Sequence, residues 1–141
     1  ILIVMDLIRK VKPHQIFVAG DLADPHGTHK VCLNAALEAI DELKKEGIMD
    51  ECRVWMYRGA WAEWEIDHIE MAVPISPEQL LNKRKSILRH QSQMESAPFM
   101  GNDERLFWQR AEDRNRATAS LYQQLGLASY EAIEAFVEYK F

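Results

Sequence analysis

Residues 15–20 read Gln-Ile-Phe-Val-Ala-Gly, a short apolar run that leads into a loop rich in Asp, Pro and Gly at 21–27. Such a run between turn-forming residues is typical of a strand buried in a parallel sheet. Apolar residues then recur at helical spacing over 28–47, with Thr28 as the expected N-cap, and a second strand is expected at 53–58. Strand, loop, helix and strand in this order predict a βαβ unit with a right-handed crossover.

The sequence on either side adds further elements to this unit. A helix is expected at 4–11, where Val4, Leu7, Ile8 and Val11 have the spacing that puts them on one apolar face. A strand is expected at 67–75. Ser-Pro-Glu-Gln at 76–79 has the pattern of a capping box, and the helix that it starts is expected to run to about Gln93.

The C-terminal part predicts a long charged helix at 103–125, ended by Gly126. Its charged residues are expected to face solvent, in pairs such as Glu112–Arg116. The residues after it should pack back as a short helix or a terminal strand. The whole chain therefore predicts one α/β domain, a Rossmann-like three-layer fold with a mostly parallel sheet.

The composition argues against several classes of protein. The chain of 141 residues has a net charge of −5, and Lys83-Arg84-Lys85 is its one dense group of cations, which speaks against nucleic acid binding. Its apolar runs fall far short of the roughly 20 residues that a membrane span needs. Cys32 and Cys52 have no CxxC partner, as expected of reduced thiols. We therefore expect a cytoplasmic protein that binds neither nucleic acid nor a membrane.

The segment 21–29 combines two aspartates and two histidines at the carboxyl end of the first predicted strand. Ligands of open α/β sheets bind at this end of the strands, and imidazole is a good zinc ligand. The same residues are also good turn formers, and Asp24 could simply close an Asx turn. From the residues alone, a metal or catalytic site and a structural loop both stay open.

Two further segments are candidates for a ligand site. The polar residues His90 to Gln93 end a predicted helix, where they border a pocket or are merely solvated. Trp-Ala-Glu-Trp-Glu at 61–65 could stack on a sugar ring and bind its hydroxyls, or could simply be packed. His14 and His68 lack companions in the sequence and are expected to be structural or on the surface.

At these segments the chain resembles the PIG-L/LmbE-like N-acetylglucosaminyl deacetylases. Pro-His-Gly-Thr-His-Lys at 25–30 is similar to the family motif His-Pro-Asp-His, with Pro-Asp replaced by Gly-Thr, and 90–93 is similar to its His-x-Ser-Gln helix end. The family's first motif, Ala-His-Pro-Asp-Asp, is absent from these residues. The resemblance thus implies that residues 1–141 are the C-terminal portion of a single LmbE-like deacetylase domain, N-terminally incomplete. The apolar opening at Ile1 also suggests a segment of a longer polypeptide.

More narrowly, residues 19–29, 57–61 and 107–115 resemble bacterial fusions named glucosamine-6-phosphate deaminase or isomerase. In these fusions an LmbE-like domain follows an N-terminal deaminase domain. The resemblance implies a role in amino-sugar metabolism, with an amino-sugar small molecule as ligand. Self-association into a homo-oligomer stays open, with Trp61, Trp64 and Phe99 as sources of an apolar patch.

The resemblance also implies roles for single residues. His29 matches a zinc ligand, and His26 matches a catalytic histidine that stabilises the transition state. His90 and Gln93 match the helix that borders the pocket. Substrate contacts are also expected from two further residues, Asp24 and Trp61.

The implied activity is that of a hydrolase, the zinc-dependent deacetylation of an N-acetylglucosamine-type substrate. Because the first metal motif is missing, the chain alone is expected to bind zinc weakly or not at all and to be inactive. The alternative is a non-catalytic module attached to a glucosamine-6-phosphate deaminase, with sugar-phosphate binding or oligomerisation as its role.

Overall fold

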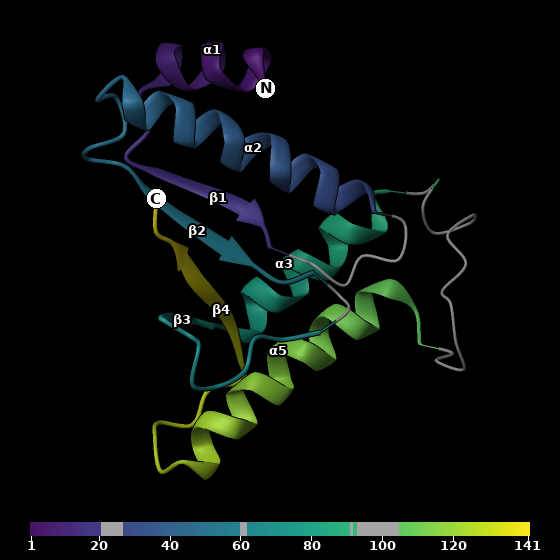
Figure 1. Ribbon diagram of the computed structural model, residues 1–141. Coiled ribbons are helices and arrows are strands. Elements are labelled where there is room, and N and C mark those ends of the chain that lie inside the picture. Colours follow the sequence, from purple (N-terminus) through teal and green to yellow (C-terminus); the bar gives the residue numbers. More distant parts are fainter. Residues whose placement is uncertain (21–26, 60–61, 91, 93–104) are drawn as a thin grey trace.

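The computed structural model describes residues 1–20, 27–59, 62–90, 92 and 105–141. Its helices and strands follow in the order α1 (Leu2–Val11), β1 (Gln15–Ala19), α2 (Thr28–Lys45), β2 (Arg53–Tyr57), β3 (Met71–Ile75), α3 (Pro77–Leu88), α5 (Phe107–Gln124) and β4 (Ala132–Tyr139). Helices α1 and α2 lie on one side of the sheet and α5 lies on the other, so the layers are those of an α/β fold (Figure 1). No helix in the described part of the chain combines the length and the hydrophobicity of a membrane span.

The sheet is mixed, with the order β1-β2-β4-β3. Strands β1 and β2 pair in parallel, as the βαβ pattern predicts, but β4 is antiparallel to both β2 and β3. The expectation of a mostly parallel sheet is therefore wrong. The chain leaving α5 returns at the end of the sheet where β3 ends, because Ala132 pairs with Ile75. The last strand must therefore run back against its neighbours.

The main core lies between α1, α2 and the sheet. Its buried members are Met5, Ile8, Ala39, Ile40, Leu43, Met49, Cys52 and Val54. Helix α1 contributes the face of Met5 and Ile8, whereas Leu7 and Val11 are 58% and 61% exposed. Of the four residues expected on one face, Val4 and Ile8 pack against the core, and Leu7 and Val11 do not, because α1 is apolar on more than one face.

Several boundaries differ from the prediction. The capping box is present, with Ser76 Oγ accepting from the Gln79 N–H at 3.1 Å, but α3 ends at Leu88 rather than near Gln93. Residues 66–68 form a turn, so β3 starts only at Met71. Helix α2 takes Gly27 as its N-cap, at φ 72°, and Thr28 is its first residue. Glycine is suited to this left-handed position because it has no Cβ.

Candidate functional site

The carboxyl ends of β1 and β2 come together around Trp64. A Cβ placed on Gly20, directly after β1, would lie 3.0 Å from Trp64 Cζ2 and 2.8 Å from Met56 Cβ. Only a glycine lets the end of β1 approach the indole this closely. The Arg58 guanidinium, directly after β2, lies 4.1 Å from the centre of the Trp64 ring, within cation–π range. Trp64 is thus fixed between the ends of the two parallel strands.

A hollow of about 460 Å³ opens beside this indole. It is lined by Trp64, Asp67, His68, Glu70 and Val137. We call this set of residues the Trp64 hollow. Its two carboxylates and its imidazole belong to exposed residues, whereas Val137 lies on β4. An aromatic wall with hydrogen-bonding groups around it is the usual chemistry of a small-molecule site.

Backbone hydrogen bonds hold the polar side of the Trp64 hollow in place. The His68 N–H donates to the Glu65 carbonyl at 2.9 Å and so closes the turn at 66–68. The Glu70 N–H donates to the Phe136 carbonyl at 3.0 Å, which ties the hollow to β4. Lys140, whose side chain is 74% exposed, pairs with Glu70 Oε2 at 3.2 Å. A cation therefore lies next to one of the carboxylates of the hollow.

A buried polar network supports the segment that carries Trp64. Glu63 Oε2 accepts from Thr118 Oγ1 at 2.8 Å, and Thr118 is 1% exposed. The Arg114 guanidinium donates to the carbonyls of Arg58 and Gly59 and, at 2.5 Å, to Glu134 Oε1. Helix α5 therefore anchors the chain just after β2.

The same network continues to α3 through Asn115, which is fully buried. Asn115 accepts from Lys83 Nζ at 2.6 Å and donates to the Ile133 carbonyl at 2.9 Å and to Glu134 Oε2 at 3.0 Å. Lys83 Nζ also lies 2.9 Å from Glu134 Oε2. Each charged group is thus paired with an opposite charge, as burial requires. We interpret this network as a support for the site and not as reacting groups.

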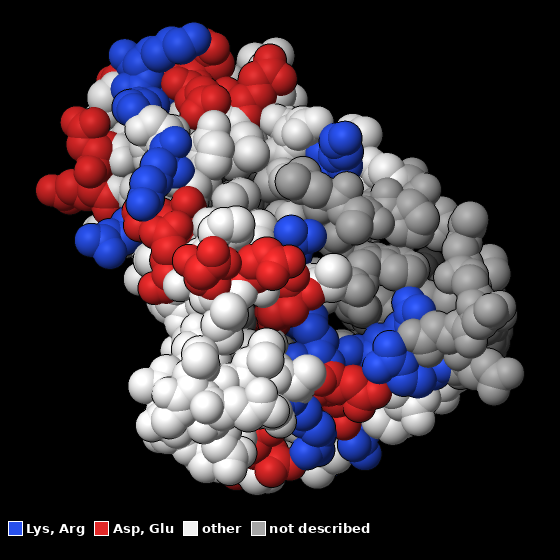
Figure 2. All heavy atoms as spheres, turned by 60° about the horizontal axis from the view of Figure 1, so that its bottom comes forward, with Lys and Arg blue, Asp and Glu red and all other residues white. Residues whose placement is uncertain are grey.

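The basic group at 83–85 has a structural role in two of its three residues. Lys83 belongs to the buried network, and Arg84 pairs with Glu112 and lies 4.3 Å from the centre of the Trp108 ring. Glu112 is 5% exposed and its partner is Arg84, so the expected solvent-facing Glu112–Arg116 pair is wrong; Arg116 pairs with Glu131 instead. On the face in Figure 2, Lys and Arg side chains are interleaved with Asp and Glu.

Most of the residues expected to act on a substrate cannot be placed. Asp24, His26, Trp61 and Gln93 lie outside the described residues. His29 is exposed in the first turn of α2, and His90 is exposed beyond the end of α3. Among the residues that the structure describes, no group of three or more His, Cys, Asp or Glu could hold a metal ion. The role of His29 as a zinc ligand therefore stays a prediction, and no reaction step is built on a metal.

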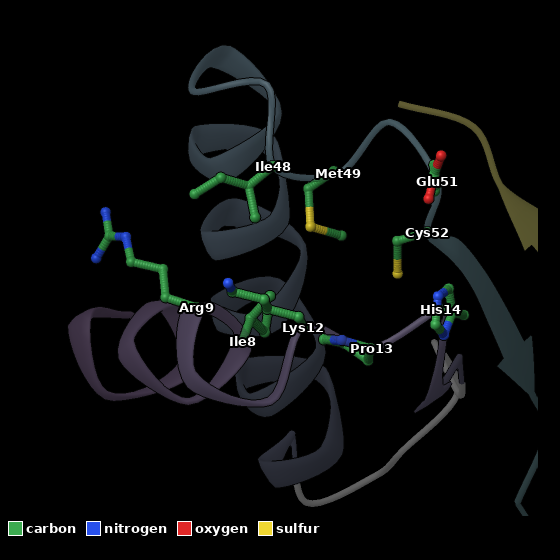
Figure 3. A pocket seen from close by; sticks show the side chains of 9 residues that line it. All are labelled: Ile8, Arg9, Lys12, Pro13, His14, Ile48, Met49, Glu51 and Cys52. Carbon is green, nitrogen blue, oxygen red and sulfur yellow. The ribbon is translucent and has the colours of Figure 1, made fainter.

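A second cavity, of about 560 Å³, lies at the amino ends of β1 and β2 (Figure 3). Arg9 is one of its cations, but its guanidinium is already engaged with Glu46 Oε1 at 2.7 Å. Burial raises the pKa of the Cys52 thiol in its wall, which keeps that thiol protonated and poorly nucleophilic. Ligands of α/β sheets bind at the opposite end of the strands, so we regard the Trp64 hollow as the better candidate site.

A local sequence signal marks this hollow. Trp64, Asp67, His68 and Glu70 stand within seven residues, an aromatic residue followed by three polar ones. His68 is exposed, as expected of a surface residue, and the turn at 66–68 brings it beside Trp64. Val137 is far away along the chain and could not be identified in advance.

A curated protein is similar to nearly the whole length of this chain. No protein-family model matches it. A curated protein of Bacteroides thetaiotaomicron, described as glucosamine-6-phosphate deaminase-like, is 75% identical over 139 residues. The match takes in 97% of this chain and 21% of the relative, so the chain spans about a fifth of that protein's length. The relative's name points to a deaminase or isomerase, and the expectation that this chain belongs to a hydrolase, a zinc deacetylase, is corrected accordingly.

Proposed function

We propose that this chain is a non-catalytic module of a glucosamine-6-phosphate deaminase-like protein and binds an amino-sugar phosphate in the Trp64 hollow. The observation that carries the proposal is the grouping of Trp64 with Asp67, His68 and Glu70 around one hollow. The 75% identity to a relative of that name supports the choice of ligand.

The groups of the hollow match the chemistry of such a ligand. The apolar C–H face of a sugar ring packs on an indole, and carboxylates accept hydrogen bonds from its hydroxyls. An unacetylated amine is an ammonium at neutral pH, and Asp67 and Glu70 offer it charge-assisted hydrogen bonds. An N-acetylated sugar has a neutral amide at the same position. We therefore expect the hollow to prefer the free amine.

The phosphate of the ligand needs a cation at the rim. Lys140 Nζ lies 3.2 Å from Glu70 Oε2 and its side chain is 74% exposed, so it can turn toward an anion without leaving a buried charge behind. An amino-sugar phosphate would then bind both residues of the Lys140–Glu70 pair, with its ammonium at the Glu70 carboxylate and its phosphate at the Lys140 ammonium. This arrangement favours the phosphorylated sugar over the free one.

A binding role fits the hollow better than a catalytic one. Asp67, His68 and Glu70 are exposed, so water is not excluded from around them as it is in most active sites. The buried charges nearby, Arg114 and Glu134, are held in ion pairs. Oligomerisation through an apolar patch at Trp64 gains no support from the described residues. Its expected companions, Trp61 and Phe99, lie outside the described residues.

Calorimetric titration of the full-length protein with glucosamine-6-phosphate tests the proposal. We expect one binding event per chain in addition to binding at the deaminase site. Asp67→Asn should remove this event and leave the other unchanged. The matched control is Asp113→Asn, another exposed aspartate, which lies on α5 and pairs with Arg105. The proposal fails if the wild type shows no additional event, or if Asp67→Asn and Asp113→Asn titrate alike.

A further inference from the structure

Among the residues that the structure describes, β1 lies at the edge of the sheet and has no strand on its outer side. The Arg53 N–H donates to the His14 carbonyl at 2.9 Å, and the Gly20 N–H donates to the Tyr57 carbonyl at 2.7 Å. In a parallel ladder, alternate residues turn both backbone groups toward the same neighbour. The N–H and C=O groups of Gln15, Phe17 and Ala19 therefore point away from β2. Across the described ranges, no hydrogen bond to these outward groups is present.

The open side of β1 has none of the usual features that protect an edge. Natural edge strands carry charges, prolines or bulges that prevent pairing with another strand. Strand β3, at the other edge, carries Pro74. Strand β1 reads Gln-Ile-Phe-Val-Ala, without a charge or a proline. Its sequence is thus suited to pairing on both sides.

A half-exposed aromatic side chain lies beside this edge. Ile16 and Val18 pack against the core on the α2 side of the sheet. Successive side chains of a strand point to opposite faces, so Phe17 points to the other face. Its ring contacts Phe136 edge-on, with 5.5 Å between centroids, yet Phe17 remains 50% exposed. An added strand would shield this ring as well as pair the backbone.

We propose that a strand from the remainder of the same polypeptide pairs with the open side of β1 and extends the sheet. The relative has about four fifths of its length outside the matched segment, which supplies ample chain for such a strand. An apolar, uncharged edge fits a permanent neighbour within one protein better than a partner that comes and goes. This inference is independent of the ligand of the Trp64 hollow.

The extension would also bear on the candidate site. Gly20 follows β1 directly and touches Trp64, so the new strand would pass beside the end of the sheet that carries the hollow. The full-length protein would thus close one flank of that region with residues from outside this chain.

Residue-resolved hydrogen exchange of the full-length protein tests the added strand. The amides of Val18 and Gly20 point to β2 and should exchange slowly. If a strand covers the edge, the exchange rates of the Phe17 and Ala19 amides should lie within about tenfold of those of Val18 and Gly20, since all four amides would then be hydrogen-bonded between strands. Exchange of Phe17 and Ala19 that is faster by about a thousandfold overturns the proposal. Protection that is lost on dilution identifies a second copy as the neighbour and overturns it too.

A pair of substitutions gives a second readout on the same protein. Phe17→Asp places a charge beside the covered edge and should lower the melting temperature by several degrees more than Leu127→Asp. Leu127 is a matched control, because it is 56% exposed against 50% for Phe17 and lies in the loop after α5. Equal effects of the two substitutions would contradict a covered edge.

Discussion

Arg84 binds Glu112 through two hydrogen bonds, from Nε to Oε1 at 2.6 Å and from Nη2 to Oε2 at 2.9 Å, and so joins α3 to α5. The glutamate is almost fully buried, with 6% of its side chain exposed. The hydrogen bonds from Arg84 lower the pKa of Glu112 below its ordinary value, although burial alone would raise it. The pair therefore depends on an ionised Glu112.

We predict that this pair makes stability fall in acid. The folded state holds the Glu112 pKa below its unfolded value near 4.5, so its contribution is complete above that pH and is lost as the pH falls through the folded pKa. Glu112→Gln should flatten the decline of the unfolding free energy below about pH 4.5 and lower the melting temperature at neutral pH by about 5 °C. Urea denaturation across pH measures the free energy, and thermal denaturation at neutral pH measures the melting temperature. Asp113→Asn, at an exposed pair, should leave the curve nearly unchanged, and parallel curves for the wild type and Glu112→Gln would contradict the prediction.

A second prediction concerns the contact between Gly20 and Trp64. Gly20→Ala places a methyl group 2.8 Å from Met56 Cβ, which is closer than real Cβ contacts, and 3.0 Å from the indole, which is tighter than most of them. The strand end or the indole must shift, which should cost about 1–3 kcal/mol of unfolding free energy and change Trp64 fluorescence. Gly47→Ala is the control, since a Cβ at this position has no neighbour within 4 Å. Its only cost is the left-handed backbone at φ 75°, which alanine adopts with strain. It should destabilise the protein without a change in the environment of Trp64.

A third prediction concerns the buried amide of Asn115. Asn115→Leu keeps the volume of the side chain but removes its hydrogen bonds with Lys83 Nζ, the Ile133 carbonyl and Glu134 Oε2. The loss of three hydrogen bonds, two of them to charged groups, should lower the unfolding free energy by about 3 kcal/mol in chemical denaturation. Asn82→Leu, on the exposed side of α3, is a matched control and should change it by less than about 0.5 kcal/mol. A loss at Asn115 no larger than that at Asn82 would mean that the network is dispensable.

The prediction of the fold succeeds where the pattern is local and fails where the pairing is distant. The βαβ unit from β1 to β2 follows from apolar periodicity and turn residues, and both strands lie where they were expected. The residues of Ala132–Tyr139 do not indicate that this strand enters between β2 and β3. The order of the strands depends on where the chain leaves the preceding helix. The mixed character of the sheet follows from that one insertion.

The site was harder to predict for the same reason. The charged face of α5 looks solvated in the sequence, yet Glu112 and Arg114 are buried because their partners, Arg84 and Glu134, come from other elements. Buried and solvated ion pairs consist of the same residue types, so the sequence pattern cannot tell one kind from the other. The polar residues of the Trp64 hollow are neighbours in the sequence, and only the turn at 66–68 brings them to one side of the indole.

The last prediction uses the backbone of Lys12, the C-cap of α1. Lys12 adopts φ 51° and ψ 58°, the left-handed region, while its N–H donates to the Ile8 carbonyl at 2.8 Å. This conformation costs an L-residue about 1 kcal/mol or more and costs glycine almost nothing. Lys12→Gly should therefore raise the unfolding free energy, by up to about 1 kcal/mol after the greater freedom of the unfolded glycine is subtracted. Lys10→Gly, inside the last turn of α1, should lower it by about 1 kcal/mol, because glycine is a poor helix former. Opposite signs in thermal denaturation of the two variants would establish that the gain comes from the left-handed cap and not from the loss of a surface charge.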